Sequence, residues 1–225
     1  AVELIEAVEE TGLIYAYGEN YCYMPAPMEM KKLYRAGKIG EAEYGECEYI
    51  HNCEPIWPSI TYGERDHWRN RKCSTYYCTH SIGPIVHITG LRPVRVTGFE
   101  GTMTERNLRT GNRSGQFAVE MLTLENGAIV KSTHGGLYKN SIWYSLYGGK
   151  GRMESARKSA KNREIHHLYV EADEYSGGYD TSSYESYEPM TGQEEAAKIF
   201  GHGGSDYYSM YNFVEKIRGN KEADT

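Results

Sequence analysis

The chain has 225 residues, and its 31 Asp and Glu outnumber its 25 Lys and Arg, which gives a net charge of −6. This length fits one large domain or two small ones, and a hydrophobic share of 39% is enough for a folded core. The acidic balance argues against a nucleic-acid or anionic-membrane binder, because no basic field offsets phosphate repulsion. The longest uncharged run, residues 73–91, holds two His, a Pro and several hydroxyls that could not be left in lipid, so no membrane span is predicted.

The numbers of cysteine and tyrosine residues indicate the cellular compartment and the kind of surface. Five cysteines are an odd number in a chain too long to need disulfide staples, which predicts free thiols in a reducing compartment and hence a cytoplasmic location. The first residues lack a basic segment followed by an apolar stretch, so no signal peptide is predicted. The 21 Tyr against 4 Phe and 3 Trp favour amphipathic surfaces, such as wet clefts or subunit interfaces.

The chain opens in an apparent helix, with apolar residues at helical spacing from Val2 to Val8 and Thr11-Gly12 closing it. Residues 13–17 then have the composition of a short buried strand of the kind found in parallel sheets. A helix feeding such a strand is typical of the end of a βαβ unit. We therefore expect the chain to be a fragment that begins in the last piece of one domain.

The organisation then changes to hairpins and helices. The predicted elements are a helix over 24–36, a strand over 41–51, an irregular stretch over 52–75, a buried helix over 77–91, a strand from 94 onward, a hairpin over 116–134 turning at Asn126-Gly127, strands over 141–147, 151–155 and 164–171, a loop over 172–192, and a helix over 207–217. Sequential hairpins with segregated helices predict an α+β fold: an open, mainly antiparallel sheet with helices packed on one face.

The densest chemistry lies at Trp68-Arg69 and in residues 74–84. If a helix begins near Tyr76, Tyr77 and His80 stand three residues apart on one face. An imidazole beside a phenol can move a proton to or from a sugar hydroxyl. The alternative is that His80 is a satisfied core histidine and Tyr77 packs against it.

A metal site is the second candidate, because Cys73, Cys78 and His80 lie close in sequence, with His51 and Cys53 upstream. Zinc sites usually show tight pairs such as C-x2-C, and this segment has none. Buried free thiols explain the cysteines better, so no metal is predicted.

Two glycine-rich runs need separate treatment. Residues 148–151 (Gly-Gly-Lys-Gly) sit between two predicted strands and lack the full P-loop pattern, so a hairpin turn is favoured over a phosphate site. In residues 200–206 the glycines permit close backbone approach, and Ser205 can cap the following helix. His202 is thus a candidate ligand contact, the alternative being an ordinary helix lead-in. His166-His167 lies in the strand predicted over 164–171, where adjacent side chains face opposite ways, so the pair cannot act jointly.

Several motifs in order carry a family resemblance. Residues 18–25 (Gly-Glu-Asn-Tyr-Cys-Tyr-Met-Pro), 36–41 (Ala-Gly-Lys-Ile-Gly-Glu) and 49–51 (Tyr-Ile-His) resemble the Gfo/Idh/MocA oxidoreductases just after their nucleotide-binding domain. The match continues through residues 66–69 (Asp-His-Trp-Arg), Thr79-His80, 91–94 (Leu-Arg-Pro-Val) and 201–207 (Gly-His-Gly-Gly-Ser-Asp-Tyr). The resemblance covers nearly the whole chain.

This family has an N-terminal Rossmann domain that binds NAD or NADP, followed by an α/β domain whose open sheet forms substrate and subunit contacts. The resemblance implies that residues 1–18 are a remnant of the Rossmann domain and that 19–225 form the substrate-binding and oligomerisation domain, truncated at its C-terminus. No G-x-G-x-x-G fingerprint stands in a strand–helix setting near the start. The family's Glu-Lys-Pro motif would fall before Ala1, and its Ile-Asp-Val-Tyr-like segment after Thr225. A carbohydrate-like substrate and a homo-oligomer through the sheet are implied.

The resemblance also implies roles. His80 matches the histidine beside the reacting hydroxyl, with Tyr77 as its catalytic partner; Asn20, Trp68 and Arg69 match positions near the nicotinamide. Tyr23, His51 and His202 are the substrate-binding candidates.

One departure is informative. Many family dehydrogenases place an Asp four residues before the histidine, where this chain has Tyr76. The Tyr-x-x-His arrangement resembles the NAD-dependent glycosidases of N-acetylgalactosaminides, which oxidise the sugar transiently at C3 and then eliminate the aglycone. A sugar or polyol dehydrogenase, such a glycosidase, and a binding and oligomerisation module that is inactive by itself remain the three hypotheses.

Overall fold

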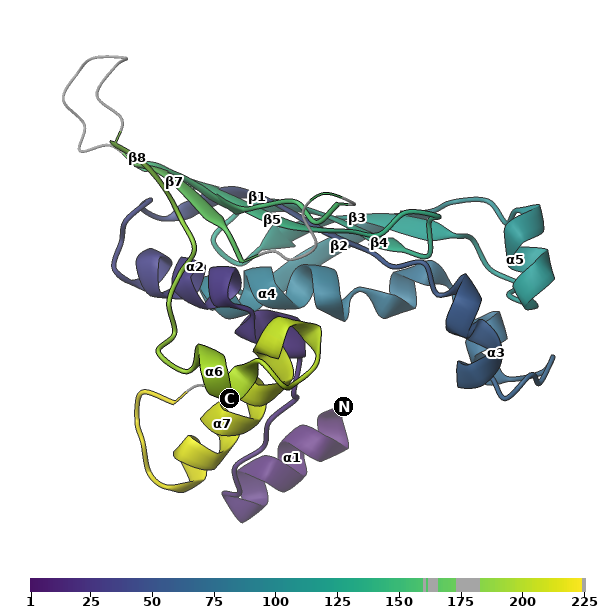
Figure 1. The fold of residues 1–225 in the computed structure, drawn as a ribbon, viewed down its shortest axis with the longest axis horizontal. Helices are drawn as coiled ribbons and strands as arrows, with labels where there is room; N and C mark the ends of the chain where they lie inside the picture. The colour runs from purple at the N-terminus through teal and green to yellow at the C-terminus, as the bar shows by residue number, and fades with distance from the viewer. Residues whose placement is uncertain (160, 162–165, 173–182, 224–225) are drawn as a thin grey trace.

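The computed structural model describes residues 1–159, 161, 166–172 and 183–223. Within these residues, eight strands form one open sheet in the order β2-β3-β4-β1-β5-β6-β7-β8 (Figure 1). All neighbouring strands are antiparallel except β1 and β4, which run parallel. The strands are β1 Ala42–Ile50, β2 Pro93–Glu100, β3 Phe117–Leu124, β4 Ile129–Gly135, β5 Ser141–Gly148, β6 Gly151–Ser155, β7 Leu168–Ala172 and β8 Ser183–Tyr187.

Helices lie on one face of this sheet and at its ends. They are α1 Val2–Thr11, η1 Asn20–Tyr23, α2 Pro25–Arg35, η2 Glu54–Ile56, α3 Trp57–Ile60, η3 Trp68–Arg71, η4 Ser74–Tyr77, α4 Thr79–Thr89, α5 Glu105–Thr110, α6 Glu194–Ala197, η5 His202–Gly204 and α7 Ser205–Ile217, where η marks a 3₁₀ helix. In Figure 1, α2 and α4 run along the sheet, α3 and α5 lie at one end, and α6 and α7 lie beyond α2. The predicted α+β fold with helices on one face is confirmed.

The core is the layer between α2, α4 and the middle strands. Met30 of α2, Ile85 of α4 and Leu146 of β5 are fully buried there. Alternation along β1 turns Cys47 and Tyr49 towards the same layer, because successive residues of a strand face opposite sides. Burying apolar side chains of this size is worth about 1.5–3 kcal/mol each, so this layer fixes α4 on the sheet.

Most predicted elements are confirmed. The helices predicted over 24–36, 77–91 and 207–217 are α2, α4 and α7, and the hairpin predicted over 116–134 is β3 and β4. Gly127 turns that hairpin with a φ of 92°, a conformation that glycine adopts without strain. The Gly-Gly-Lys-Gly run joins β5 to β6, as the turn interpretation predicted.

Four predictions need correction. Residues 13–17 are irregular and mostly exposed, since no strand of the described sheet lies beside them to accept their hydrogen bonds. The loop predicted over 172–192 contains edge strand β8; its part at 173–182 lies outside the described residues. His166 and His167 precede β7 rather than lying in it. Ser205 does not cap α7 with its side chain, because the cap residue is Gly204 and the Ser205 hydroxyl donates to the carbonyl of His202.

Among the described residues, none of the helices combines the length and the apolarity needed to cross a lipid bilayer.

Candidate functional site

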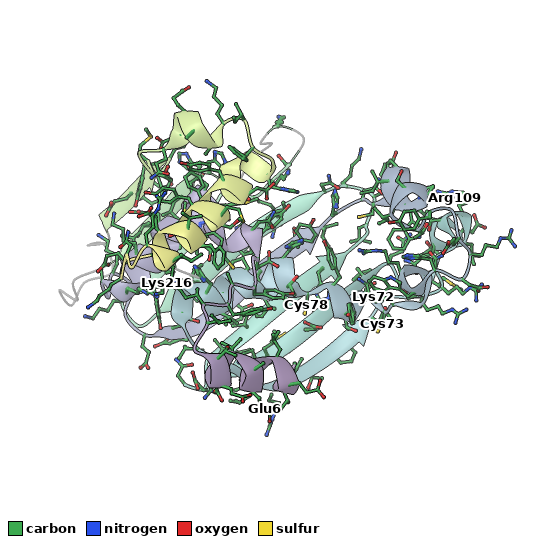
Figure 2. The ribbon with its side chains drawn as sticks, turned by 90° about the horizontal axis from the view of Figure 1, so that it is seen from below. Glu6, Lys72, Cys73, Cys78, Arg109 and Lys216 are labelled. Atoms are coloured by element: carbon green, nitrogen blue, oxygen red, sulfur yellow. The ribbon has the colours of Figure 1, made fainter. Side chains whose placement is uncertain are left out.

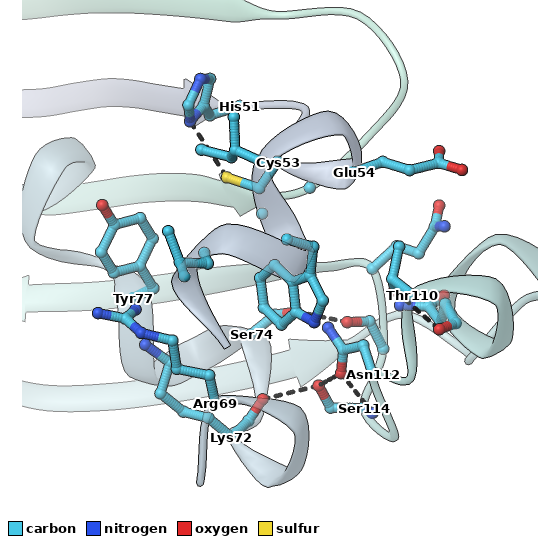
Figure 3. A pocket seen from close by; sticks show the side chains of 18 of the residues that line it. His51, Cys53, Glu54, Arg69, Lys72, Ser74, Tyr77, Thr110, Asn112 and Ser114 are labelled. Carbon is cyan, nitrogen blue, oxygen red and sulfur yellow. Dashed lines mark hydrogen bonds between the residues drawn. The ribbon is translucent and has the colours of Figure 1, made fainter. Parts of the chain in front are cut away.

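A cavity of about 330 Å³ opens between the ends of β1 and β4, the turn before α4, and the small helices α3 and α5. Tyr49, Tyr77 and His80 line one end of it, whereas Trp57 and Asn112 line the other. Figure 3 shows His51, Cys53 and Tyr77 around one part of this space, with Arg69 and Lys72 next to Tyr77. The cavity therefore joins the phenol and imidazole groups of one end to an indole and an amide at the other.

The turn from η4 into α4 places Tyr77 and His80 together. Their spacing of three residues brings the Tyr77 hydroxyl to 3.0 Å from Nε2 of His80. Two more phenol rings pack against the imidazole, with ring centroids 4.5 Å away for Tyr21 and 4.6 Å away for Tyr49, and these two rings also contact each other at 5.0 Å. His80 lines the cavity and its side chain keeps 18% exposure, so the imidazole is not enclosed in the core, although both of its ring nitrogens have partners within the protein.

The backbone of His80 is held by an unusual bond. Pro84 lies inside α4, four residues after His80, and its ring nitrogen carries no hydrogen to donate to the His80 carbonyl. The fully buried Tyr144 of β5 donates its hydroxyl to that carbonyl at 2.5 Å. The sheet thus replaces the missing helical bond and holds the first turn of α4 in place.

Glu19, just before η1, orients the imidazole. Its Oε1 lies 2.5 Å from Nδ1 of His80, and its side chain is only 10% exposed. Gly83 permits this approach, since a Cβ there would lie 3.0 Å from Cγ of Glu19. A carboxylate can only accept, so Nδ1 carries the proton and Nε2 is left as an acceptor facing Tyr77. The three groups form a continuous chain from carboxylate to imidazole to phenol.

Burial sets the protonation of the neighbouring groups. Desolvation raises the pKa of Tyr21 to about 12 and also raises the pKa values of Tyr49 and Tyr77, so these phenols stay protonated near neutral pH. Burial lowers the pKa of His51, which lies with Nδ1 3.2 Å from Sγ of Cys53. Burial likewise raises the pKa of the Cys53 thiol. The phenols, the imidazole of His51 and the thiol of Cys53 are therefore neutral hydrogen-bonding groups near neutral pH.

A second network reaches the cavity from α7. His202 lines the cavity, and its Nδ1 lies 2.8 Å from Asp206, whose other oxygen accepts the Asn20 amide at 2.7 Å. Burial raises the pKa of Asp206, but the hydrogen bonds from Asn20 and His202 outweigh it and lower the pKa overall. Asp206 thus remains a carboxylate that fixes both side chains.

The structure brings together only part of the predicted site. Tyr77, His80, His51, His202 and Arg69 all line the cavity.

The other three predicted residues lie elsewhere. Asn20 is bonded to Asp206 behind His202, and Trp68 is 55% exposed beside the cavity mouth, under the Arg69 guanidinium. Tyr23 is a correction: it is buried in a small cluster with Cys22, Ala197 and Tyr208, so the geometry does not support contact with a substrate.

The sequence analysis missed Glu19, Tyr49 and Lys72. Glu19 and Tyr49 stand inside the motifs that carry the family resemblance, at 18–25 and 49–51, which was the available signal. Lys72 follows Trp68-Arg69 closely but belongs to no motif. Among the described residues, no three His, Cys, Asp or Glu side chains gather in a way that could hold a metal ion, and none of the five cysteines, all of them described, forms a disulfide.

Comparison with known proteins identifies proteins that are similar to this chain in sequence. No family model matches the chain. It is 25% identical to an α-N-acetylgalactosaminidase of Tannerella forsythia, over 97% of the chain and 54% of that protein. It is 24% identical to a glycosyl hydrolase family 109 protein of Parabacteroides distasonis, over 98% of the chain and 55% of that protein. The chain thus spans about half the length of the curated relatives it matches.

Solved structures add the fold. A levoglucosan dehydrogenase in complex with NADH and levoglucosan superposes with a TM-score of 0.67 at 16% identity, over 96% of the chain and 60% of that protein. An aldose-aldose oxidoreductase of Caulobacter crescentus, complexed with glycerol, gives a TM-score of 0.62 at 18% identity, over 97% of the chain and 58% of that protein. The resemblance to the Gfo/Idh/MocA group is confirmed: the chain has the fold of these oxidoreductases and is similar in sequence to family 109 glycosyl hydrolases.

Proposed function

We propose that the chain is the substrate-binding portion of a two-domain, NAD- or NADP-dependent oxidoreductase that acts on a hydroxyl of a sugar, polyol or related compound. The observation that carries the proposal is the chain of Glu19, His80 and Tyr77 at one end of the cavity, with contacts of 2.5 Å and 3.0 Å. Bound dinucleotide supplies the hydride acceptor, and the protein supplies orientation and a place for the hydroxyl proton.

His80 acts as the general base in this proposal. Its Nε2 accepts the proton of the substrate hydroxyl, and Glu19 keeps the Nδ1 proton in place and offsets the positive charge that results. The Tyr77 hydroxyl, protonated because burial raises its pKa, donates to the substrate oxygen or to Nε2. Tyr21 and Tyr49, which contact each other, pack together against the imidazole and limit its movement.

The residues next to the cavity fit the nicotinamide end of a dinucleotide. The Trp68 ring is exposed and flat, and the Arg69 guanidinium lies 4.7 Å from its centre. Asn20 is held by Asp206, which also bonds His202 of the cavity lining. We assign Asn20, Trp68 and Arg69 to the cofactor side, as the resemblance implies.

The test is substitution of the proposed base in the intact enzyme. His80→Ala should lower turnover about 10²–10⁴-fold, the usual contribution of a general base, and should leave dinucleotide affinity nearly intact. Tyr77→Phe should lower turnover by a smaller factor. His167→Ala is the matched control, since His167 bonds Ser186 on β8, outside the cavity. Wild-type turnover in His80→Ala would remove His80 from the mechanism.

A redox-assisted glycosidase is the second candidate, favoured by the family 109 relatives in sequence and by the Tyr-x-x-His spacing. Both candidates begin with loss of the same hydroxyl proton to His80. An aryl glycoside separates them: the glycosidase releases the phenol with no net reduced nucleotide, whereas the dehydrogenase accumulates reduced nucleotide in proportion to product.

Residues 1–18 belong, in this proposal, to the nucleotide-binding domain, and 19–225 to the substrate domain. Helix α1 supports this division, because it buries none of its residues and leaves Val2 and Ile5 exposed on its apolar face. By itself the chain should then be inactive and show no useful NAD affinity. Tight NAD binding by the isolated chain, measured by titration, would contradict the division.

We also propose a homo-oligomer that forms through the open sheet face, which the helices of Figure 1 leave uncovered. That face carries the exposed Phe99 and Met121 together with the ion pair of Lys131 and Glu46. Free thiols support a reducing, cytoplasmic setting, and the acidic balance argues against nucleic acid or an anionic membrane as partner.

A further inference from the structure

The cavity is positively charged although the chain as a whole is acidic. Its lining includes the cations Arg69, Lys72 and Arg106, but Glu54 is the only carboxylate among the described lining residues. Glu54 is already engaged, at 2.5 Å from Nε of Arg106 and 2.9 Å from Arg109. In the described part of the chain, neither Arg69 nor Lys72 has a carboxylate within ion-pair distance.

Lys72 is held where an ammonium group is costly. It is half-buried, and its ammonium lies 5.2, 4.7 and 4.9 Å from the ring centres of Trp68, Tyr76 and Tyr77. Burial first, and the neighbouring Arg69 second, lower the pKa of Lys72. The nearby Cys53 thiol does not balance this charge, because burial raises its pKa and keeps it neutral. Two adjacent cations of this kind are stabilised when an anion binds between or beside them.

The position of Lys72 indicates which part of a bound ligand would carry the anionic group. Its ammonium lies against the face of Tyr77, and the Tyr77 hydroxyl is 3.0 Å from Nε2 of His80. Figure 2 places Lys72 and Cys73 between Cys78, just before α4, and the end of the molecule marked by Arg109. An anion held by Lys72 would therefore be carried by the sugar ring whose hydroxyl reaches His80.

We propose that Lys72 forms a subsite for the carboxylate of an acidic sugar, so that the substrate class is the uronic acids and their glycosides; Arg69, assigned to the cofactor side, adds positive charge next to this subsite. The inference rests on the proposed function and narrows it. A carboxylate fits because the ammonium group donates charge-assisted hydrogen bonds to its oxygens. The cation–π contacts hold the ammonium in place before the ligand arrives.

The test compares two ligands that differ only at C6. Calorimetric titration of the intact enzyme with methyl α-D-galacturonoside and with methyl α-D-galactoside should show about tenfold tighter binding of the acid. Lys72→Met keeps the apolar stem and should abolish that preference. Lys139→Gln is the matched control, because Lys139 also lies over a tyrosine, Tyr138 at 4.8 Å, but outside the cavity; it should keep the preference.

Three outcomes would overturn the inference. The first is equal affinity for the two glycosides in the wild type. The second is an acid preference that survives in Lys72→Met while thermal unfolding shows that the variant is folded. The third is a loss of ADP and NAD affinity in Lys72→Met equal to the loss of galacturonoside affinity, which would assign Lys72 to the dinucleotide phosphates.

The inference and the proposed function fail separately. His80→Ala should lose turnover and still prefer the galacturonoside. Full turnover in His80→Ala with the preference intact would refute the function alone, whereas lost turnover without any acid preference in the wild type would refute the subsite alone.

Discussion

Tyr144→Phe tests how the sheet holds helix α4, which carries His80. The substitution removes one hydroxyl and leaves the buried His80 carbonyl without its donor, because Pro84 cannot supply one. An unsatisfied buried carbonyl costs about 1–3 kcal/mol, and the phenyl ring still fills the same space. Urea unfolding should therefore show a loss of about 1–3 kcal/mol. Tyr62→Phe, at a site that is 80% exposed, should change the free energy of unfolding by less than about 0.5 kcal/mol.

The cause can be isolated with a second substitution. Pro84→Ala restores a backbone N–H four residues after His80, so the carbonyl regains a helical donor. In the Pro84→Ala background, Tyr144→Phe should cost clearly less than in the wild type, and the difference between the two costs is the coupling energy. Equal costs in both backgrounds would refute the reasoning, because the hydroxyl would then be stabilising something other than the freed carbonyl.

Three further predictions follow from the same geometry. Glu19→Gln keeps the size of the side chain but removes its negative charge, and the hydrogen bond to His80 joins side chains that are only 10% and 18% exposed. The substitution should lower turnover of the intact enzyme roughly 10–150-fold, the equivalent of about 1.5–3 kcal/mol. The Michaelis constant should change little. Met30→Ala should lower the free energy of unfolding by about 2–5 kcal/mol because Met30 is fully buried, whereas Met210→Ala, 61% exposed, should be nearly neutral in the same urea titration. Burial lowers the pKa of His134 from 6.5 to about 4, so the unfolded chain binds the extra proton first as the pH falls; stability should be lost between about pH 6.5 and pH 4, by on the order of 3 kcal/mol, and His134→Gln should flatten that slope. Burial raises the pKa of the neighbouring Glu120, which gives a slope of opposite sign, so the pH series is read as the difference between wild type and His134→Gln.

Local signals predicted the elements that have them. The β3–β4 hairpin alternates and turns at Asn126-Gly127, and α4 is an apolar run closed by Gly90 in the left-handed conformation. Edge strand β8 has no such signal. Its sequence is Ser-Tyr-Glu-Ser-Tyr, and its pairing with β7 lets polar residues remain exposed. Residues 13–17 fail for the opposite reason: an apolar composition predicts burial only when another element covers it.

In the candidate site, too, local contacts could be predicted from the sequence and long-range contacts could not. The spacing of Tyr77 and His80 is local, so the sequence predicts their contact once a helix is placed there. Glu19 lies 61 residues before His80 in the chain, and its role depends on how η1 packs on α4 at Gly83. Lys72 is a candidate binding residue only because aromatic rings surround its ammonium group and because no carboxylate among the described residues pairs with it. Neither property is visible in the order of residues.

The candidate site and the hydrophobic core both depend on the position of the first turn of α4. The groups around the imidazole come from η1, β1, η4 and β5, and all of them contact the first turn of α4. That turn is fixed on the sheet by Ile85 and Ile88, which are 0% and 1% exposed. In the proposed mechanism, loosening this packing would move Nε2 of His80 away from the substrate hydroxyl before the sheet unfolds, and a displacement of about 1 Å can cost 10²-fold in rate. Turnover should therefore be lost at a lower urea concentration than the sheet, because proton transfer depends on the position of one helix turn rather than on the survival of the fold.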